Sequence, residues 1–529
     1  MALQDSSSSS PNTSGASSAA ATSSASTSQF SPPSSILIIG SGVFGLSTAY
    51  ALTQRDGYAN TTITVVDRAV GHGSGDVVFP ARDSSSIDSS RIIRADYADP
   101  AYAALAAEAL KHWRQASSPG NLGAQGRYSE NGLVLVADGS SDKLETSTAV
   151  DGVASPAQVD KATKSGADYV RASYENAVAL NRDEPDLASR IRMLTDVNAI
   201  REAVGTGGAS GTSGYINGYA GWADAEKSMA WLFDRVKRTG RVGFVNGTVS
   251  SLTHTDGTVT GARLEDGRNL TADLVILATG AWTATLLDLS GQATATGQVI
   301  GYLDITEQEQ EQLGQMPTLL NLTNGLFIIP PVNRQLKVAR HAYGYLNPTR
   351  PSATTPLTNT SKPPRPISYP RTALTTPPAL TIPKEGMDDL RHALREMLPS
   401  HPAIHDRPFT KTRLCWYTDT PTGDFLITYH PKFNGLFVAT GGSGHGFKFL
   451  PVLGNKIVDV VEGHCPSEFV DRWAWKGGLG DDGDAGVVST EDGSRGGRRG
   501  LILDDEMRKT LTAFGMNDGC YSVDEDPDL

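Results

Sequence analysis

The chain has 529 residues, of which 39% are hydrophobic, so it is long enough to bury a large core and to form two domains. Its formal net charge of −12 argues against nucleic acid or an anionic membrane surface as the main partner. Cys415, Cys465 and Cys520 form no CxxC motif, which indicates a reducing compartment, and no apolar run approaches the roughly 20 residues that a membrane span needs.

Residues 1–34 consist mostly of Ser, Ala, Thr and Pro and contain no Lys or Arg. A secretory signal needs a basic start and an apolar core, and a mitochondrial transit peptide needs arginine, so the composition predicts a disordered tail instead. The chain ends in Asp528-Leu529, which is not a peroxisomal Ser-Lys-Leu address. We therefore expect a cytoplasmic protein.

The stretch 36–39 is a short apolar run that predicts a strand, and the glycine loop 40–45 follows it and opens a helical segment. A second apolar run at 63–66 ends in Asp67. A dinucleotide pyrophosphate needs backbone N–H groups and a helix N-terminus within touching distance, and side chains at these glycines would block it. Asp67 suits a ribose 2′-hydroxyl and would repel a 2′-phosphate, so FAD or NAD is favoured over NADP.

The same glycine pattern also arises by chance in a chain with 55 glycines. It recurs at 478–483, but no strand precedes this second copy and its two aspartates would repel phosphate. Context therefore selects the first copy. Its expected cofactor contacts are Gly40, Ser41, Gly42, Val43, Phe44, Gly45, Asp67 and Arg68.

Two arginines, Arg91 and Arg94, lie three positions apart, which predicts one side of a helical turn. Such a pair either holds an anionic group or forms a solvated, salt-bridged surface turn. A helix is expected at 102–113 and a strand at 132–136, whereas 139–215 is polar and weakly patterned.

Asp224 is expected to cap a helix that runs to Val236. Strands follow at 242–245 and 248–252, and a buried strand at 273–278 ends in a small-residue turn at Gly280. This turn is either a second point of close approach to the cofactor or the end of an ordinary parallel core strand.

Short strands beyond Gly291 indicate a mixed sheet. We expect strands at 298–305, 326–330 and 336–343, a surface loop at 351–384, a helix at 385–398, and a mostly flexible tail at 475–529 with a short helix at 504–514.

Five segments in this order carry a family resemblance: the Gly40 loop with Asp67, Ser90 to Arg94, Leu336-Lys337 with His341, Cys415 to Pro421, and Gly441 to Phe449. The sequence resembles the amine oxidases that include monomeric sarcosine oxidase, N-methyltryptophan oxidase, pipecolate and saccharopine oxidases and the fungal fructosyl amino acid oxidases. The resemblance runs with interruptions from Ser35 to about Gly463.

The resemblance implies an α/β fold with a Rossmann-like FAD-binding domain interleaved with an α+β, mixed-sheet substrate domain. The expected division is a tail at 1–34, an FAD-binding domain at 35–100, 224–292 and 405–463, a substrate domain at 101–223 and 293–404, and the tail at 475–529.

The resemblance also implies roles for single residues. Arg94 and Lys448 hold a substrate carboxylate, Lys337 lies near flavin N5, and Cys415 is joined covalently to the flavin 8α-methyl group. Tyr417 either adds a hydroxyl to the site or is a buried core tyrosine. The expected catalytic residues are Lys337, Arg91, Arg94, Lys448 and Tyr417; further cofactor contacts are Ser90, Arg91, Gly280, Cys415, Gly442, Gly444, His445, Gly446, Phe447 and Lys448, and no metal is expected.

The residue types suit this chemistry. Arg94 offers a planar fork and Lys448 a point charge for one carboxylate. A cation at Lys337 in a dry site would stabilise the negative charge that develops on O₂. Arg413 would favour the thiolate of Cys415. His445, in a glycine loop, is expected to make a structural hydrogen bond instead of acting as a base.

We therefore predict a monomeric FAD-dependent oxidase that converts the C–N bond of a secondary amine amino acid to an imine, with O₂ as acceptor and hydrogen peroxide as product. Alternatives are a biosynthetic oxidase whose intermediate closes a ring, a fructosyl amino acid oxidase, an NAD-dependent dehydrogenase, and a flavin-binding protein kept for interaction. The Arg-Ile-Ile-Arg sequence at 91–94 disfavours sugar-derivatised amines as substrates. Bacterial sarcosine oxidases have a histidine shortly before the paired arginines, and this chain has none at 84–90.

Overall fold

The computed structural model describes residues 30–68, 80–139, 164–349, 357, 366–372, 381–477 and 488–515. The fold belongs to the unit that begins at Pro32. The predictions for residues 1–29, for the second glycine pattern at 478–483, for most of the loop 351–384 and for Cys520 lie outside the described residues.

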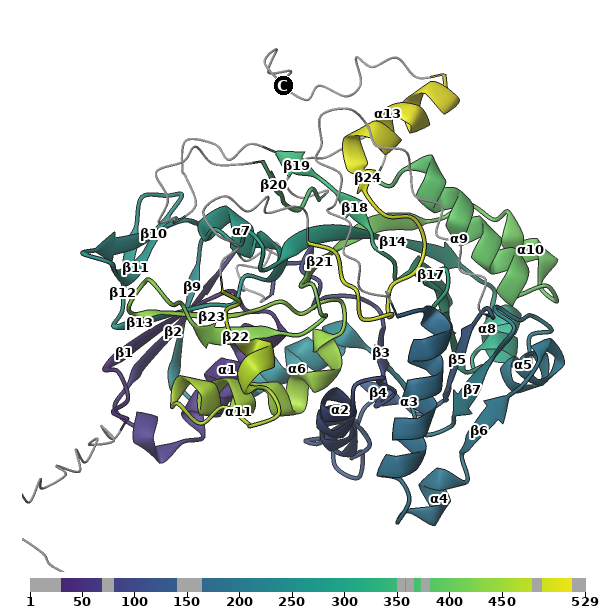
Figure 1. Ribbon diagram of the computed structural model, residues 1–529, viewed down its shortest axis with the longest axis horizontal. Coiled ribbons are helices and arrows are strands. Elements are labelled where there is room, and N and C mark those ends of the chain that lie inside the picture. Colours follow the sequence, from purple (N-terminus) through teal and green to yellow (C-terminus); the bar gives the residue numbers. More distant parts are fainter. Residues whose placement is uncertain are drawn as a thin grey trace, which may run out of the picture. The chain divides into compact units, whose positions relative to one another are not determined.

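A six-stranded sheet carries the predicted strand and glycine-loop unit (Figure 1). Its order is β22 (Leu426–Tyr429), β23 (Leu436–Thr440), β13 (Leu274–Leu277), β1 (Ser35–Ile39), β2 (Thr62–Asp67) and β9 (Val242–Asn246). All neighbours are parallel except β22, which pairs antiparallel with β23. The Rossmann-like prediction is therefore confirmed.

Alternation along β1 explains how this sheet is covered on both faces. Ile36 and Ile38 pack in the core that holds α1 (Val43–Thr53), α6 (Ala225–Arg238) and α11 (Leu450–Val461). Leu37 and Ile39 point the other way and pack with β10 (Val249–Thr255) and β11 (Thr258–Leu264) of a three-stranded sheet that β12 (Asn269–Thr271) completes. A continuous apolar strand is what burial on two faces requires.

The second large sheet has ten strands and is mixed, as predicted. Its order is β24 (Leu501–Ile502), β18 (Tyr345–Leu346), β14 (Thr294–Asp304), β17 (Gln335–Arg340), β16 (Leu326–Val332), β15 (Thr318–Asn321), β5 (Leu133–Ala137), β7 (Ser213–Asn217) and β6 (Ile191–Leu194), with β21 (Lys411–Asp419) also paired to β14. The strand β21 therefore lies in this sheet, although the expected division placed 405–463 with the nucleotide domain.

One expected element is wrong. Arg91 and Arg94 do not share a helical turn, because β3 (Arg91–Ile93) is a strand that pairs antiparallel with β8 (Gly221–Ala223), beside β4 (Tyr128–Ser129). In a strand successive side chains alternate between faces, so residues three apart point in opposite directions. The two arginines consequently have separate partners.

The C-terminal segment also differs from the expectation of a mostly flexible tail. Within 488–515, Val488, Thr490 and Arg495 are buried, and β24 leads into the predicted helix, α13 (Leu503–Ala513), drawn in yellow (Figure 1). This segment packs against the ten-stranded sheet through the pairing of β24 with β18.

The remaining helices are short or cover the sheets, and none of the helices in the described ranges is long and apolar enough to cross a membrane. They are α2 (Pro100–Trp113), α3 (Gly166–Leu180), α4 (Pro185–Ala188), α5 (Val197–Val204), α7 (Thr283–Leu286), α8 (Glu307–Leu313), α9 (Lys384–Met397), α10 (Pro402–His405) and α12 (Val470–Trp473), with 3₁₀ turns at Asp56–Tyr58, Gly280–Trp282 and Gly446–Phe449 and a small pair of strands, β19 (Pro348–Thr349) and β20 (Ile367–Ser368).

Candidate active site

A cavity of about 1010 Å³ is lined by residues from both large sheets. It gathers most of the sequence-predicted residues: Gly40, Gly42, Val43, Phe44, Asp67, Arg68, Ser90, Arg91, Arg94, Gly280, Lys337, Tyr417, Gly442, Gly444, His445, Gly446, Phe447 and Lys448. Ser41, Gly45 and Cys415 do not line the cavity, but each is adjacent in the chain to, or in contact with, a residue that does.

The glycine loop is too tightly packed for side chains. Gly40 has a φ of +100°, and a Cβ there would meet the carbonyl oxygen of Ala278 at 2.4 Å. A Cβ on Gly45 would lie 1.9 Å from the carbonyl oxygen of Gly40. The loop therefore brings its backbone and the N-terminus of α1 directly to the cavity, where N–H groups can bind a pyrophosphate. A dinucleotide fits these residues.

Asp67 fixes the loop from the end of β2. Its Oδ2 accepts hydrogen bonds from the backbone nitrogen of Ser41 at 2.8 Å and from the Ser41 hydroxyl at 2.6 Å. Burial raises the pKa of Asp67, while these bonds from Ser41 lower it. Arg68, the next residue, stacks over the Trp282 ring at 4.4 Å and donates to Asp83 at 3.0 Å.

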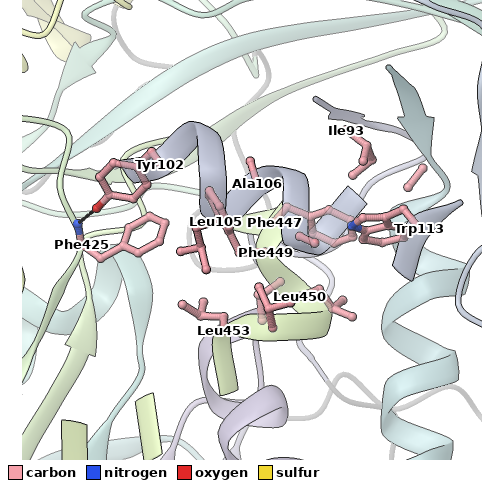
Figure 2. Close-up of a cluster of buried hydrophobic side chains, with 14 of the residues drawn as sticks. Ile93, Tyr102, Leu105, Ala106, Trp113, Phe425, Phe447, Phe449, Leu450 and Leu453 are labelled. Atoms are coloured by element: carbon pink, nitrogen blue, oxygen red, sulfur yellow. Dashed lines mark hydrogen bonds between the residues drawn. The ribbon is translucent and has the colours of Figure 1, made fainter. Parts of the chain in front are cut away.

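A turn at 446–449 delivers Lys448 to the cavity, and a buried apolar cluster holds this turn (Figure 2). Trp113 of α2 lies against Phe447 in Figure 2 and donates from its indole nitrogen to the Lys448 carbonyl oxygen at 2.7 Å. Phe449 and Leu450 continue the cluster. The position of Lys448 therefore follows from core packing, not from a mobile loop.

Arg94 and Lys448 are 6% and 5% exposed and both line the cavity. Lys448 donates to the Tyr97 hydroxyl at 2.8 Å, and both cations lie 5.0 Å from the Tyr97 ring centre. Within the described residues neither makes an ion pair with a carboxylate, and Nη1 of Arg94 has no hydrogen-bond partner there. The carboxylate of Asp96 acts on both cations without forming an ion pair with either, so two buried cations remain free to bind an anionic ligand directly.

Electrostatics differ between these two cations. Burial acts to lower the pKa of Arg94, but Tyr169, Tyr97 and Asp96 outweigh it and raise that pKa above its ordinary value. Burial lowers the pKa of Lys448 well below its usual range, and the charge of Arg94 lowers it further. Lys448 is therefore the cation of the pair whose charge responds to a bound anion.

His445 makes the structural contacts that were predicted for it. Its Nε2 lies 2.7 Å from the Gly423 carbonyl oxygen, so this nitrogen donates, and Nδ1 accepts from the Tyr97 hydroxyl at 2.8 Å. The imidazole stacks on Phe425, and burial lowers its pKa well below the ordinary value. Both ring nitrogens are engaged, so His445 orients Tyr97.

Arg495 was not predicted; it does not line the cavity but contacts His341, which does. Its guanidinium donates to Asp419 and to the Ser443 carbonyl oxygen, each at 2.7 Å, and to Nε2 of His341 at 2.6 Å. His341 must be neutral to accept this bond, and burial lowers its pKa well below the usual value. In the sequence, the short basic run at 495–499 is the only feature that could have drawn attention to Arg495.

Lys337 lies on β17 at the cavity wall and donates to the Asp88 carboxylate at 2.8 Å and to the Ser90 carbonyl oxygen at 2.7 Å. Asp88 also accepts from Arg91 and was not predicted as a site residue. Arg91 reaches onward to the Cys415 Sγ at 3.4 Å. The buried thiol on β21 thus faces a guanidinium, and Arg413 lies two positions away on the same strand face.

Comparisons with known proteins agree with this geometry. Residues 35–460 match the family model described as "FAD dependent oxidoreductase". The chain is 32% identical over 492 residues to amino acid oxidase imqH of Aspergillus flavus, covering 84% of this chain and 98% of that protein. It is 27% identical to L-saccharopine oxidase of Schizosaccharomyces pombe, covering 84% and 93%.

A crystal structure of a modified fructosyl peptide oxidase from Aspergillus nidulans superposes with a TM-score of 0.69 at 25% identity, covering 90% of this chain and 98% of that chain. The family match spans the six-stranded sheet, the ten-stranded sheet except β24, and every predicted site residue. The chain therefore belongs to the family of FAD dependent oxidoreductases, and it is an oxidoreductase of the group that contains the FAD-dependent amino acid and amine oxidases.

Proposed function

We propose that this protein oxidises the C–N bond of a secondary amine amino acid, N-substituted or cyclic, to an imine, with O₂ as the acceptor and hydrogen peroxide as the second product. The observation that carries the proposal is the buried, unpaired cation pair Arg94 and Lys448, with Nη1 of Arg94 unpartnered among the described residues. A substrate carboxylate would accept hydrogen bonds from both cations.

FAD would be held by the Gly40 loop, Asp67, Gly280 and the turn around Gly442, which line one continuous cavity. When bound, FAD takes two electrons from the substrate and passes them to O₂. We propose that it is attached covalently through Cys415, whose thiol faces Arg91 at 3.4 Å.

The chain's own groups position the substrate. The carboxylate is fixed between Arg94 and Lys448, and Tyr417 of β21 lines the same cavity and offers a hydroxyl. Lys337, 3% exposed, contributes a cation in a dry environment where negative charge develops during oxygen reduction. Such positioning of reactants is the largest contribution that a protein can make to this kind of reaction.

Relatives named as an amino acid oxidase and an L-saccharopine oxidase support an amino acid substrate. The decisive test is peroxide release by the purified protein on sarcosine, pipecolate, saccharopine, N-methyl aromatic amino acids and fructosyl amines. We expect turnover with one or more of the first four substrates. Turnover of fructosyl amines alone would select the fructosyl alternative, and no peroxide from any of them would refute the proposal.

Four further properties belong to the proposal and have simple measurements. Acid precipitation should leave yellow colour with the protein, because covalent flavin cannot be released. Sedimentation should report a monomer, and fractionation of the source cells should recover the protein in the cytoplasm. Product mass separates hydrolysis, which cleaves the amine, from ring closure, which removes only two hydrogens.

A further inference from the structure

One buried carboxylate, that of Asp88, connects two cations that line the cavity, Lys337 and Arg91. Its side chain is fully buried. It accepts from the Lys337 ammonium at 2.8 Å, from the Tyr302 hydroxyl at 2.5 Å, from the Ser89 backbone nitrogen at 2.7 Å, and from Arg91. These donors, with the Ser89 hydroxyl at 3.5 Å, make Asp88 the centre of this part of the site.

The donors come from separate elements that the fold brings together. Tyr302 on β14 lies directly opposite Lys337 on β17 in the antiparallel register, so both side chains stand on the same face. Arg91 comes from β3, and β21 adds the charge of Arg413. Asp88 is thus the point where four elements meet around the Lys337 ammonium.

Charge counting shows what the carboxylate does. The pKa of Lys337 is lowered to about 8 because burial, with help from Arg91, outweighs the opposing effect of Asp88 and a smaller one of Cys415. Burial acts to raise the pKa of Asp88, but Arg91, Lys337 and Arg413 outweigh it and hold that pKa well below its ordinary range. Asp88 is therefore ionised whenever Lys337 needs a counter-charge.

We propose that Asp88 is the positioning residue for Lys337, holding its ammonium group charged and fixed at the cavity wall, while the same carboxylate keeps Arg91 beside Cys415. This inference rests on the proposed function for the use that oxygen reduction makes of the Lys337 charge. Stability alone is a weak reason for such a cluster, because replacing buried ion pairs by apolar groups is often neutral or stabilising.

The test uses the resting, flavin-loaded enzyme and needs no substrate. A charge beside the flavin changes its visible absorption, so a pH titration of the spectrum reports the protonation of Lys337. In the natural protein we expect a transition near the Lys337 pKa of about 8, which burial sets. In Asp88→Asn the transition should move down by about one pH unit or more, and Lys337→Met should abolish it.

The oxygen reaction provides a second readout in the same variants. When reduced Asp88→Asn enzyme is mixed with O₂ at a pH above both transitions, its rate constant should be about tenfold below that of the natural protein for each pH unit by which the transition has moved. Lowering the pH should restore the rate. Glu309→Gln, which removes a carboxylate from the 2.8 Å pair with Arg407 away from the cavity, should leave both readouts unchanged.

If Asp88→Asn fails to fold, Tyr302→Phe tests the same inference, because this variant retains the Asp88 carboxylate and removes only one of its donors. The freed carboxylate attracts Lys337 more strongly, so the transition should move upward. A transition unchanged in Asp88→Asn, or lowered in Tyr302→Phe, would overturn the inference. Absence of peroxide with every substrate would refute the proposed function instead, since the spectral titration does not depend on turnover.

Discussion

The charged side chains around the cavity fall into two groups at the level of single residues. Lys337 is paired with Asp88 and Arg495 with Asp419, so these cations are neutralised inside the protein. Arg94 has no such partner among the described residues, although the chain as a whole carries a net charge of −12. The selectivity for an anionic group is therefore local to the end of the cavity that Arg94 lines.

Replacing Arg94 by alanine should weaken substrate binding and leave flavin content unchanged. Removing one partner of a buried, hydrogen-bonded charge pair costs about 2–5 kcal/mol, so KM should rise by roughly 30-fold or more. Arg94→Lys keeps the charge and loses the planar fork, so its KM should lie between those of the natural protein and Arg94→Ala. Steady-state kinetics and the flavin-to-protein absorbance ratio measure these effects, and an unchanged KM in Arg94→Ala would contradict the role.

The lowered pKa of Lys448 predicts that carboxylate binding depends on pH. Below this pKa the ammonium is charged and binds a carboxylate well, whereas above it the neutral amine binds weakly, so affinity should fall as pH rises. A bound carboxylate should also draw a proton onto Lys448. Calorimetry with acetate in two buffers of different ionisation enthalpy measures this uptake, which should vanish in Lys448→Met; equal uptake in both proteins would contradict the assignment.

At the level of elements, the sequence predicted those whose chemistry is local and missed those that depend on distant pairing. The glycine loop, the Asp224-capped helix and the buried strand before Gly280 follow from short patterns and are confirmed. The segment 91–94 was taken for a helical turn because its pairing partner, β8, lies far along the chain. The spacing between Arg91 and Arg94 carries no information on the strand with which this segment pairs.

The site residues divide in the same way. Lys337, Arg94 and Lys448 were predictable because each belongs to a recognisable segment. Asp88 and Arg495 were not, because their importance comes from burial and from partners on other elements. Burial of a charge is a property of the assembled fold and leaves little trace in a local pattern.

The close crossing of α1 and α11 yields a prediction at this scale. Gly454 of α11 faces α1, and a Cβ there would lie 2.0 Å from the Ser47 carbonyl oxygen. Gly454→Ala should push the helices apart and, because α1 begins at the glycine loop, should lower flavin content as well as stability, by about 1–3 kcal/mol. Gly477→Ala, where a Cβ meets nothing within 4 Å, is the control, and equal melting temperatures would contradict the argument.

For the molecule as a whole, the cavity couples the two large sheets. The glycine loop follows β1 of the six-stranded sheet, whereas Lys337 and Tyr417 stand on strands of the ten-stranded sheet, and all three line the same 1010 Å³. A cofactor that fills this space contacts both sheets at once. Its binding energy therefore adds to the stability of the whole folded unit and not to one domain alone.

This coupling predicts how stability responds once the proposed covalent bond is removed. Cys415→Ala should release its flavin on acid precipitation, whereas Cys465→Ala, at a partly exposed cysteine, should not. Because a reversible ligand stabilises by about 2.7 kcal/mol at a hundredfold excess over its Kd, the melting temperature of Cys415→Ala should rise with added FAD. That of the natural protein should be independent of added FAD, since its cofactor cannot exchange. If added FAD raises the melting temperatures of the natural protein and Cys415→Ala equally, the flavin is not tethered. If added FAD stabilises neither protein, the cofactor does not join the two sheets across the cavity.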